Sequence, residues 1–273
     1  MLTPAIEVEL EHRYGQAKLW RAGRVLLVLA LLVVLAAWQA EVDMETLFRD
    51  LPTGISKLGV FFPPAWEALP ELVEPAIVTL LLALVPLPIG MALAIPVAFA
   101  GAANLAPPWL RTITRTYITF QRNLPEIVLV LILVRAFGLG AFPGIVALAL
   151  GSVGMLSKLF ADAIEEIEPE QLEAIECTGG TRWQVIRYAV VPALMPSIIA
   201  NGLFRFEINM RQAILLGAVG AGGLGYELTY ALNRLEYPHV TISFLVLLGL
   251  IAMAERVSDF LRRILLSEGQ VRD

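Results

Sequence analysis

The sequence predicts an all-helical integral membrane protein with about six transmembrane helices. Hydrophobic residues make up 58% of its 273 residues and charged residues only 16%, whereas a water-soluble domain carries more charge on its surface. The charges are also bunched, so several uncharged stretches approach the roughly 20 residues that a helix needs to cross a bilayer. These stretches are 25–40, 75–110, 136–157, 188–204 and 238–254.

The charges around these stretches predict how the chain is oriented. If the N-terminus is cytoplasmic, the inside segments contain thirteen of the twenty Lys and Arg residues, the outside segments contain three, and four lie within spans. Because basic residues accumulate in cytoplasmic segments, we expect both termini in the cytoplasm. The first span, 25–39, precedes an outside segment, 41–74, in which we expect a loop with an interfacial helix. A signal peptide is the alternative for 25–37, but the preceding 24 residues are too long and mixed in charge.

The second span, 77–100, contains Pro86, Pro88 and Pro96. Each proline lacks a backbone donor and bends a helix, so we expect kinks in this span. Two explanations stay open for these kinks. Neighbouring helices can satisfy the freed carbonyl groups, as is common in membrane proteins, or the kinks can form a gating hinge. The third span, 112–137, is expected to be one continuous helix.

The fourth span, 145–159, leads into a segment that cannot lie in lipid, because seven acidic residues fall between positions 161 and 176. Pro169 suits the first position of a helix, and the glycine pair that begins at Gly179 can end this helix with a left-handed cap. Thr181 begins a capping-box pattern with the glutamine three residues later. The sequence therefore predicts a short helix, a glycine break and a second helix that continues into the fifth span.

Charged residues lie inside the third and fifth spans. Arg122 is roughly 15 Å from the inner end of its span at 1.5 Å per residue, and Arg205 and Glu207 are comparably deep in theirs. Glu126 follows Arg122 by four residues and Arg211 follows Glu207 by four, so each pair shares one face of a continuous helix. Ionisable groups at this depth are costly and normally mark function or pairing.

Two readings of these charges stay open. They form either a structural network of ion pairs that holds spans three and five together, or a path along which the arginines ease an anion through the membrane. The structural reading is favoured, because paired charges cancel each other and a path must not hold its substrate too tightly. Within this reading we expect Arg122 to pair with Glu207.

A glycine-rich run, with Gly220, Gly222, Gly223 and Gly225, follows the fifth span. Three of these glycines have the spacing G-x-G-x-x-G, but a dinucleotide-binding turn needs a preceding strand and a βαβ unit. We therefore expect a gate or close-packing turn instead. The chain contains no G-x-x-x-x-G-K-[ST] motif and only two histidines, so we expect no enzyme site and no metal or other cofactor in this chain.

The predicted cytoplasmic helix carries a resemblance to a known family. The pair Glu173-Ala174, followed by Gly179 and later by Pro192, resembles the coupling motif of permeases of binding-protein-dependent ABC importers. In that family this loop docks onto the ATPase subunit, which implies that these four residues and Arg182 contact the ATPase. The second alanine of the motif is isoleucine here, a departure that puts close packing in doubt. A plain loop helix is the alternative.

Four further segments resemble the permeases of phosphonate importers in particular. They are 123–126, 158–168, 205–211 and 216–225, and the likeness covers 73–265. It implies the transmembrane domain of a type I ABC importer with a cytoplasmic coupling helix. It also implies that a periplasmic binding protein delivers the substrate, that two permease subunits form the pathway, and that two ATPase subunits, which bind ATP and Mg²⁺, drive transport.

Together these observations predict a multi-pass permease of the bacterial inner membrane that works as a homodimer in the lipid bilayer, with no nucleic-acid partner. Its substrate would be phosphonate, phosphite or hypophosphite. The expected division is an N-terminal part, 1–72, with the first span and a periplasmic loop, a permease core, 73–265, and a cytoplasmic tail, 266–273. The alternatives are an unlike second permease subunit, a membrane scaffold, and an ion-driven secondary transporter that uses Glu126 and Glu207 as ion sites.

Overall fold

The computed structural model describes residues 4–39 and 44–267. The described chain consists of two compact units that divide between Gly59 and Val60. All regular elements in the described residues are helices, so the all-helical prediction is confirmed. The expected tail, 266–273, lies outside the described residues from position 268 onward.

The first unit contains two helices, α1 (Pro4–Gln39) and α2 (Met44–Lys57). The part Trp20–Gln39 of α1 is long and apolar enough to cross a membrane, and it includes the predicted first span. Its leucine and valine side chains are exposed, as expected of a helix whose neighbours are lipid chains. The helix expected in the following segment is α2.

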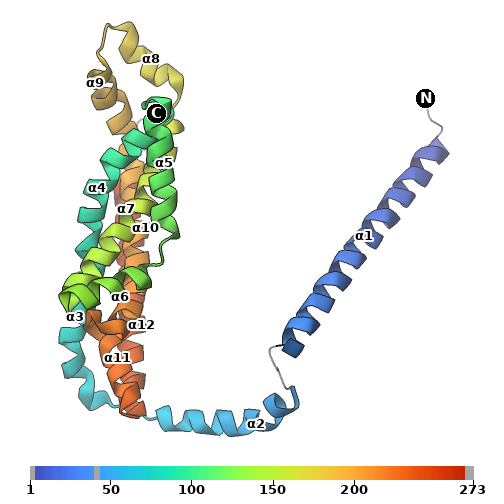
Figure 1. Cartoon of the computed structure of the whole chain (residues 1–273), viewed down its shortest axis with the longest axis vertical. Helices are drawn as coiled ribbons and strands as arrows, with labels where there is room; N and C mark the ends of the chain where they lie inside the picture. Colours follow the sequence, from blue (N-terminus) through green and yellow to red (C-terminus); the bar gives the residue numbers. More distant parts are fainter. Residues whose placement is uncertain (1–3, 40–43, 268–273) are drawn as a thin grey trace. The chain divides into compact units, whose positions relative to one another are not determined.

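The second unit is a helical bundle (Figure 1). Its helices are α3 (Val73–Leu84), α4 (Pro86–Gly101), α5 (Pro108–Asn123), α6 (Glu126–Phe137), α7 (Ala141–Glu165), α8 (Pro169–Cys177), α9 (Arg182–Val185), α10 (Val191–Leu216), α11 (Gly223–Asn233) and α12 (Tyr237–Ser267). Helix α7 is central, because it packs against α4, α5, α6 and α10. Two short 3₁₀ segments precede α3, and one π-helical turn lies at each end of α10.

Small residues let α4 and α7 approach each other closely. Ala94 and Ala98 of α4 are fully buried against Leu156 and Phe160 of α7. A Cβ atom added at Gly90 would lie 2.5 Å from the Cβ of a serine on α7, so only glycine fits at this contact. Such close approach is the usual source of helix association in membranes, where lipid removes most of the hydrophobic driving force.

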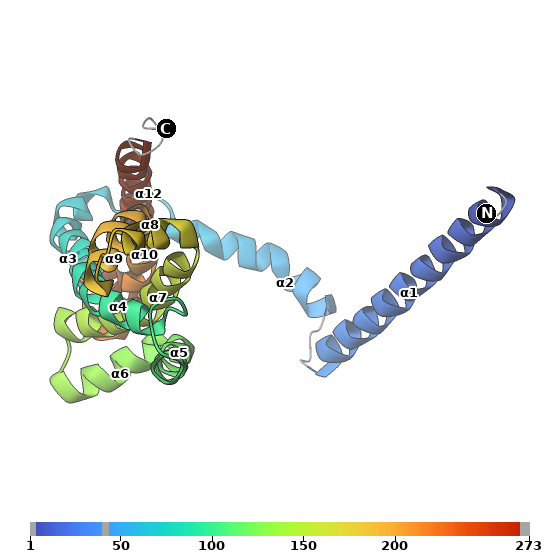
Figure 2. The same ribbon diagram turned by 90° about the horizontal axis from the view of Figure 1, so that it is seen from above.

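Five described helices or helix groups are long and apolar enough to span a membrane, and the bent pair of α5 and α6 makes a sixth candidate. The predicted count of about six spans is therefore confirmed. The expectation of a continuous third span is wrong, because α5 and α6 meet at an angle of 81°. Figure 2 shows α5 nearly end-on while α6 runs across the view.

The break in the third span has a local cause. Leu124 has extended backbone angles, φ −79° and ψ 117°, because the residue before a proline is sterically pushed out of the helical region. Pro125 then precedes the first residue of α6. The second span differs, since Val85 between α3 and α4 keeps helical angles and the prolines there interrupt hydrogen bonding without a sharp bend.

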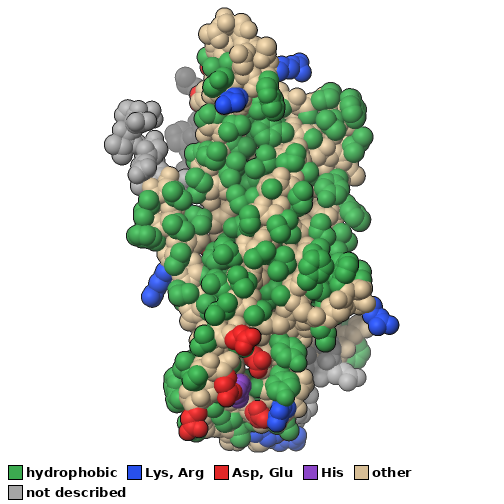
Figure 3. Space-filling model, turned by 90° about the vertical axis from the view of Figure 1, so that its left-hand side faces the viewer, with side chains coloured by type: hydrophobic (Ala, Val, Ile, Leu, Met, Phe, Trp, Pro, Cys, Tyr) green, Lys and Arg blue, Asp and Glu red, His purple; other side chains and the backbone are tan. Residues whose placement is uncertain are grey.

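The surface of the second unit fits a membrane environment. In the face drawn in Figure 3, hydrophobic side chains cover the middle, whereas acidic side chains gather towards one end. Exposed leucine, isoleucine and phenylalanine side chains lie on α3, α6 and α12. A water-soluble protein seldom exposes apolar surface of this extent, so this middle band is the lipid-facing surface.

Candidate functional site

Helix α8 lies at one end of the bundle (Figure 1). It begins at Pro169, and it ends before Gly179, whose φ of +80° provides the left-handed cap. Both predictions for this helix are confirmed. Leu172 anchors α8 to the buried cluster around Phe160, while Glu173 and Ala174 are exposed. A short, capped helix thus presents its outer face to a partner.

The second helix after the glycine break begins as predicted. The backbone N–H of Thr181 donates to Oε1 of Gln184 over 2.7 Å, and the reciprocal contact completes a capping box. From α9 the chain continues through a π-helical turn into α10 without a break. Arg182 and Pro192 are exposed, so all five residues that the resemblance assigned to docking are accessible at this end of the molecule.

A groove of about 400 Å³ separates α8 and α9 from the turn between α4 and α5. Asn104 and Pro107 line it from the turn, and Glu176 and Arg182 line it from the opposite side. The sequence motif gave no sign that the α4–α5 turn belongs to this end, because the two segments are far apart in the chain. The groove widens the candidate docking surface beyond the motif.

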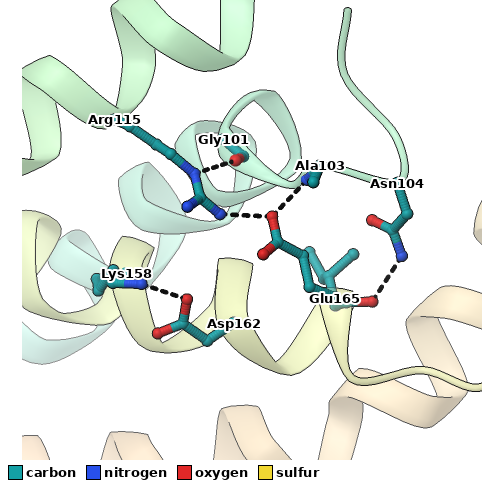
Figure 4. A network of polar contacts seen from close by, with 8 residues as sticks. Gly101, Ala103, Asn104, Arg115, Lys158, Asp162 and Glu165 are labelled. Atoms are coloured by element: carbon teal, nitrogen blue, oxygen red, sulfur yellow. Dashed lines mark hydrogen bonds and ion pairs between the residues drawn. The ribbon is translucent and has the colours of Figure 1, made fainter. Parts of the chain in front are cut away.

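The α4–α5 turn is tied to the end of α7, as Figure 4 shows. Oε1 of Glu165, the last residue of α7, accepts hydrogen bonds from Nη2 of Arg115 on α5 and from the backbone N–H of Ala103. Nε of Arg115 also donates to the carbonyl oxygen of Gly101. One carboxylate therefore joins α7, α5 and the end of α4 directly before the chain turns into α8.

Two further contacts support this junction. Nδ2 of Asn104 donates to the carbonyl oxygen of Ile164 over 2.8 Å. Nζ of Lys158 contacts the carboxylate of Asp162 one turn along α7. Together with the charge-assisted bond between Glu165 and Arg115, the bond from Asn104 connects the end of α7 to α5 and to the α4–α5 turn.

Arg205 is the most deeply buried charge, with a side chain only 3% exposed. Its Nη2 donates to Oε1 of Glu126 over 2.7 Å, its Nε donates to Oγ of Ser152 over 2.8 Å, and its Nη1 lies 3.5 Å from the sulfur of Met155. An ion pair between spans three and five was expected, but between Arg122 and Glu207 and not between Glu126 and Arg205. A paired and hydrogen-bonded arginine of this burial holds α6, α7 and α10 together.

The expected pair of Arg122 and Glu207 does not form. Glu207 instead lies 3.3 Å from Arg262, and Arg211 lies 2.6 Å from Glu255, so both contacts join α10 to α12. The prediction failed because it assumed that the whole third span packs on the fifth, whereas α5, which carries Arg122, packs on α4 and α7.

Arg122 therefore does not share a helix face with Glu126. It is exposed, and the ion pairs of the described residues do not include it. The sequence could not reveal that Glu255 and Arg262 of α12 are the partners of α10. Their spacing does not show which face of α12 packs on α10.

The glycine run forms a tight break between α10 and α11. Gly220, Gly222 and Gly223 have φ angles of +107°, +89° and +73°, which other residues adopt only with strain. A Cβ added at Gly225 would lie 2.1 Å from the carbonyl oxygen of Ile214. This geometry is consistent with a close-packing turn, and among the described residues no strand precedes the run. The described residues also contain no group of three potential metal ligands.

Five to six candidate spans in the described residues, a buried ion pair between α6 and α10 and an accessible helical loop at one end of the bundle are the features of a multi-pass membrane permease. The chain belongs to the family described as the binding-protein-dependent transport system inner membrane component, which matches residues 87–267. Members of this family are inner-membrane subunits that work with a substrate-binding protein and a separate ATPase, so this chain is a transporter subunit and not the ATPase.

Curated relatives and solved structures agree with this assignment. The chain is 35% identical over 247 residues to the phosphite transport system permease protein PtxC of Stutzerimonas stutzeri, covering 89% of this chain and 90% of the relative. It is 37% identical to the phosphate-import permease protein PhnE of Mycolicibacterium smegmatis, covering 85% of this chain and 44% of the relative. The MetNI methionine ABC transporter in an inward-facing conformation matches with a TM-score of 0.66 at 22% identity, covering 73% of this chain and 98% of that chain. The expected type I importer fold is confirmed.

Proposed function

We propose that this chain forms the translocation pathway of an ATP-driven importer for phosphonate, phosphite or a related phosphorus oxyanion. The similarity to a phosphite permease over 89% of the chain is the observation that carries this proposal. A periplasmic binding protein delivers the anion. Two ATPase subunits, which bind ATP and Mg²⁺, switch the pathway between a state open to the periplasm and a state open to the cytoplasm. The chain itself supplies the membrane path and the contact to the ATPase.

Helix α8 and the groove beside it are the proposed ATPase contact. Ala174 on α8 and Gly179 just after it place two small residues on the exposed side of this loop, where a partner groove can approach closely. Glu173 and Arg182 add charges of both signs at its rim. The excess of basic residues in the segments on this side supports a cytoplasmic position for α8 and for both termini.

Two copies of the chain are proposed to face each other across the pathway. Arg211 has a side chain 52% exposed, and its partner Glu255 is 43% exposed. Charges at this depth along α10 and α12 are costly against lipid, so this face lies against another protein surface or against water. One chain also provides one α8, whereas two ATPase subunits require two. A homodimer satisfies both requirements.

An ion-driven secondary transporter is not favoured. That mechanism needs carboxylates that release and take up a proton or sodium ion, but Glu126 is bound by Arg205 and Glu207 by Arg262. Each of these carboxylates already has an arginine as its counter-cation. Family membership points the same way, since the family couples transport to a separate ATPase.

Gentle extraction from the native membrane followed by native mass spectrometry tests this proposal. We expect a complex with two copies of this chain and two copies of one ATPase, whose ATP hydrolysis rises when the binding protein is loaded with phosphite or an alkylphosphonate. Amino-acid-loaded and empty binding protein are the controls. A chain that extracts as a single copy without an ATPase would count against the assembly.

A further inference from the structure

We propose that the exposed polar face of α5 is the surface along which the oxyanion crosses the membrane, with Arg122 as its principal cation. This inference rests on the proposed function, because it states where the transported anion meets the chain. It narrows the alternative reading, in which the arginines of spans three and five form an anion path, to Arg122, because Arg205 and Arg211 are paired with carboxylates.

Helix α5 has three distinct faces. Its buried face, formed by Thr114, Ile118 and Gln121, packs on the bundle, and Nε2 of Gln121 donates to a carbonyl oxygen of α7. An exposed apolar face is formed by Trp109, Ile113, Tyr117 and Phe120. The remaining exposed face, called here the polar face, is formed by Thr112, Thr116, Thr119 and Asn123.

The polar face is continuous along the helix. Its four residues follow one another at intervals of four, three and four, the spacing that keeps side chains on one side of an α-helix. A groove of about 620 Å³ runs along this side. Its lining consists of the polar-face residues with Pro108, Arg111, Arg115 and Phe120, and Arg122 lies outside it, near the end of the helix. The apolar face suits lipid, but the polar face does not, so we expect it to face water between two copies of the chain.

The charges of α5 select for anions. Arg111, Arg115 and Arg122 lie at the edge of the polar face, and no Asp or Glu occurs from Pro108 to Asn123. Arg115 is neutralised by Glu165. Arg122 is exposed and outside the ion pairs of the described residues, which leaves it available to an oxyanion.

The position of Arg122 is set by its neighbours. The stem of its side chain lies over Gly154 of α7, where an added Cβ would come within 3.4 Å of Cγ of Arg122. It stands one residue before the end of α5, where the chain bends by 81° into α6. Arg205, by contrast, is buried and already bound to Glu126 and Ser152, so it supports the bend and its charge is already compensated.

The threonines of the polar face favour weak binding of the oxyanion. The hydroxyl groups of Thr112, Thr116 and Thr119 each donate to the carbonyl oxygen four residues earlier. They make the surface wettable without offering a fixed donor to the anion. A conducting path needs sites that are strong enough to admit an ion and weak enough to release it. Hydroxyl groups beside Arg111 and Arg122, which are both outside the ion pairs of the described residues, meet this need.

Cysteine labelling tests whether the polar face is wet. Cys177 is exposed, so the background is Cys177→Ser. Thr116→Cys and Thr119→Cys are compared in the assembled transporter with Ile113→Cys and Tyr117→Cys, two positions of the apolar face that do not line the groove. We expect an anionic, membrane-impermeant methanethiosulfonate to label the two polar-face positions quickly and the apolar ones at least about tenfold more slowly, because the reactive thiolate forms in water. Equal labelling on both faces would overturn the proposal.

Transport kinetics test the role of Arg122. Arg122→Gln should slow ATP-dependent phosphite uptake by about tenfold, because a charge-assisted contact is lost, while Arg122→Lys should keep most of the rate. Arg135→Gln is the matched control, since Arg135 is an exposed arginine of α6 away from the polar face. Wild-type uptake by Arg122→Gln would refute the role of Arg122.

The two tests separate this inference from the proposed function. If the labelling pattern appears while the wild-type transporter carries no phosphorus oxyanion, the polar face stands as the water-filled path and the proposed substrate is wrong. If oxyanions are carried while polar-face cysteines stay unlabelled during turnover, the substrate stands and the polar face is wrong.

Discussion

Arg205 and Glu126 show at the scale of single residues how a charge can be accommodated inside a membrane. The arginine is bound by a carboxylate, a hydroxyl group and a sulfur atom, so burial does not leave its charge uncompensated. Gly151 makes room for the pair, because an added Cβ there would lie 2.1 Å from Oε1 of Glu126. The sequence predicted charges of both signs at this depth but not the partners, which depend on how each helix is rotated.

Removing one member of this pair should be costly. Glu126→Gln should lower the free energy of unfolding by about 3 to 5 kcal/mol, since it leaves Arg205 buried without its counter-charge. Arg211→Gln is the control, because its ion pair is half-exposed and should be worth about 1 kcal/mol or less. Thermal unfolding in detergent measures both. A Glu126 variant as stable as the control would show that the pair has no structural role.

Two glycines provide a second comparison at this scale. Gly225→Ala should destabilise the fold strongly, because its Cβ would meet a backbone carbonyl that cannot move aside. Gly249→Ala on α12 has nothing within 4 Å of the new Cβ, and it should be neutral or gain up to about 1 kcal/mol from helix propensity. The melting temperatures of the two variants check this. Equal shifts would mean that the break between α10 and α11 is loosely packed.

At the scale of elements, the ends of helices were predictable where their causes are local. Pro169, Gly179 and the Thr181 capping box determine the ends of α8 and α9 through neighbouring residues alone. The break in the third span was also visible locally, as the pair Leu124-Pro125. It was missed because hydropathy was averaged over the whole span, and the error then assigned Arg122 and Glu126 to one face.

The exposed face of α8 gives a prediction about docking. Ala174→Asp should leave the melting temperature of the isolated permease unchanged, because Ala174 is exposed, but it should abolish copurification of the ATPase by placing a bulky charge in the contact. Ala174→Ser is the conservative control and should keep the ATPase bound. An Ala174→Asp variant that still binds and drives transport would exclude this face of α8 from the contact.

The junction at Glu165 gives a prediction about coupling. Glu165→Gln removes the charge that holds Arg115 and weakens the link from α7 to α5, so the amount transported per ATP hydrolysed should fall several-fold while the complex still assembles. Glu166→Gln is the matched control, because its side chain is exposed. Simultaneous assays of uptake and hydrolysis measure the ratio. Equal ratios in the two variants would show that motion reaches α5 by another route.

At the scale of the whole molecule, the sequence was sufficient for the class of protein, because hydrophobic composition and bunched charges do not depend on tertiary structure. The residues that line the path through the membrane could not be predicted from the sequence in this way. A single chain offers only half of the proposed pathway, and the side chains that line it can be recognised only when the packed faces of α5 and α10 are known.

Reconstitution of the purified permease with its ATPase and binding protein into liposomes tests the central claim most directly. The measurement is uptake of phosphite in the presence and absence of ATP, with an ionophore added to collapse any ion gradient. The proposed function predicts uptake that requires both ATP and the binding protein and that is unaffected by the ionophore. Uptake that continues without ATP and stops when the ion gradient is collapsed would contradict it.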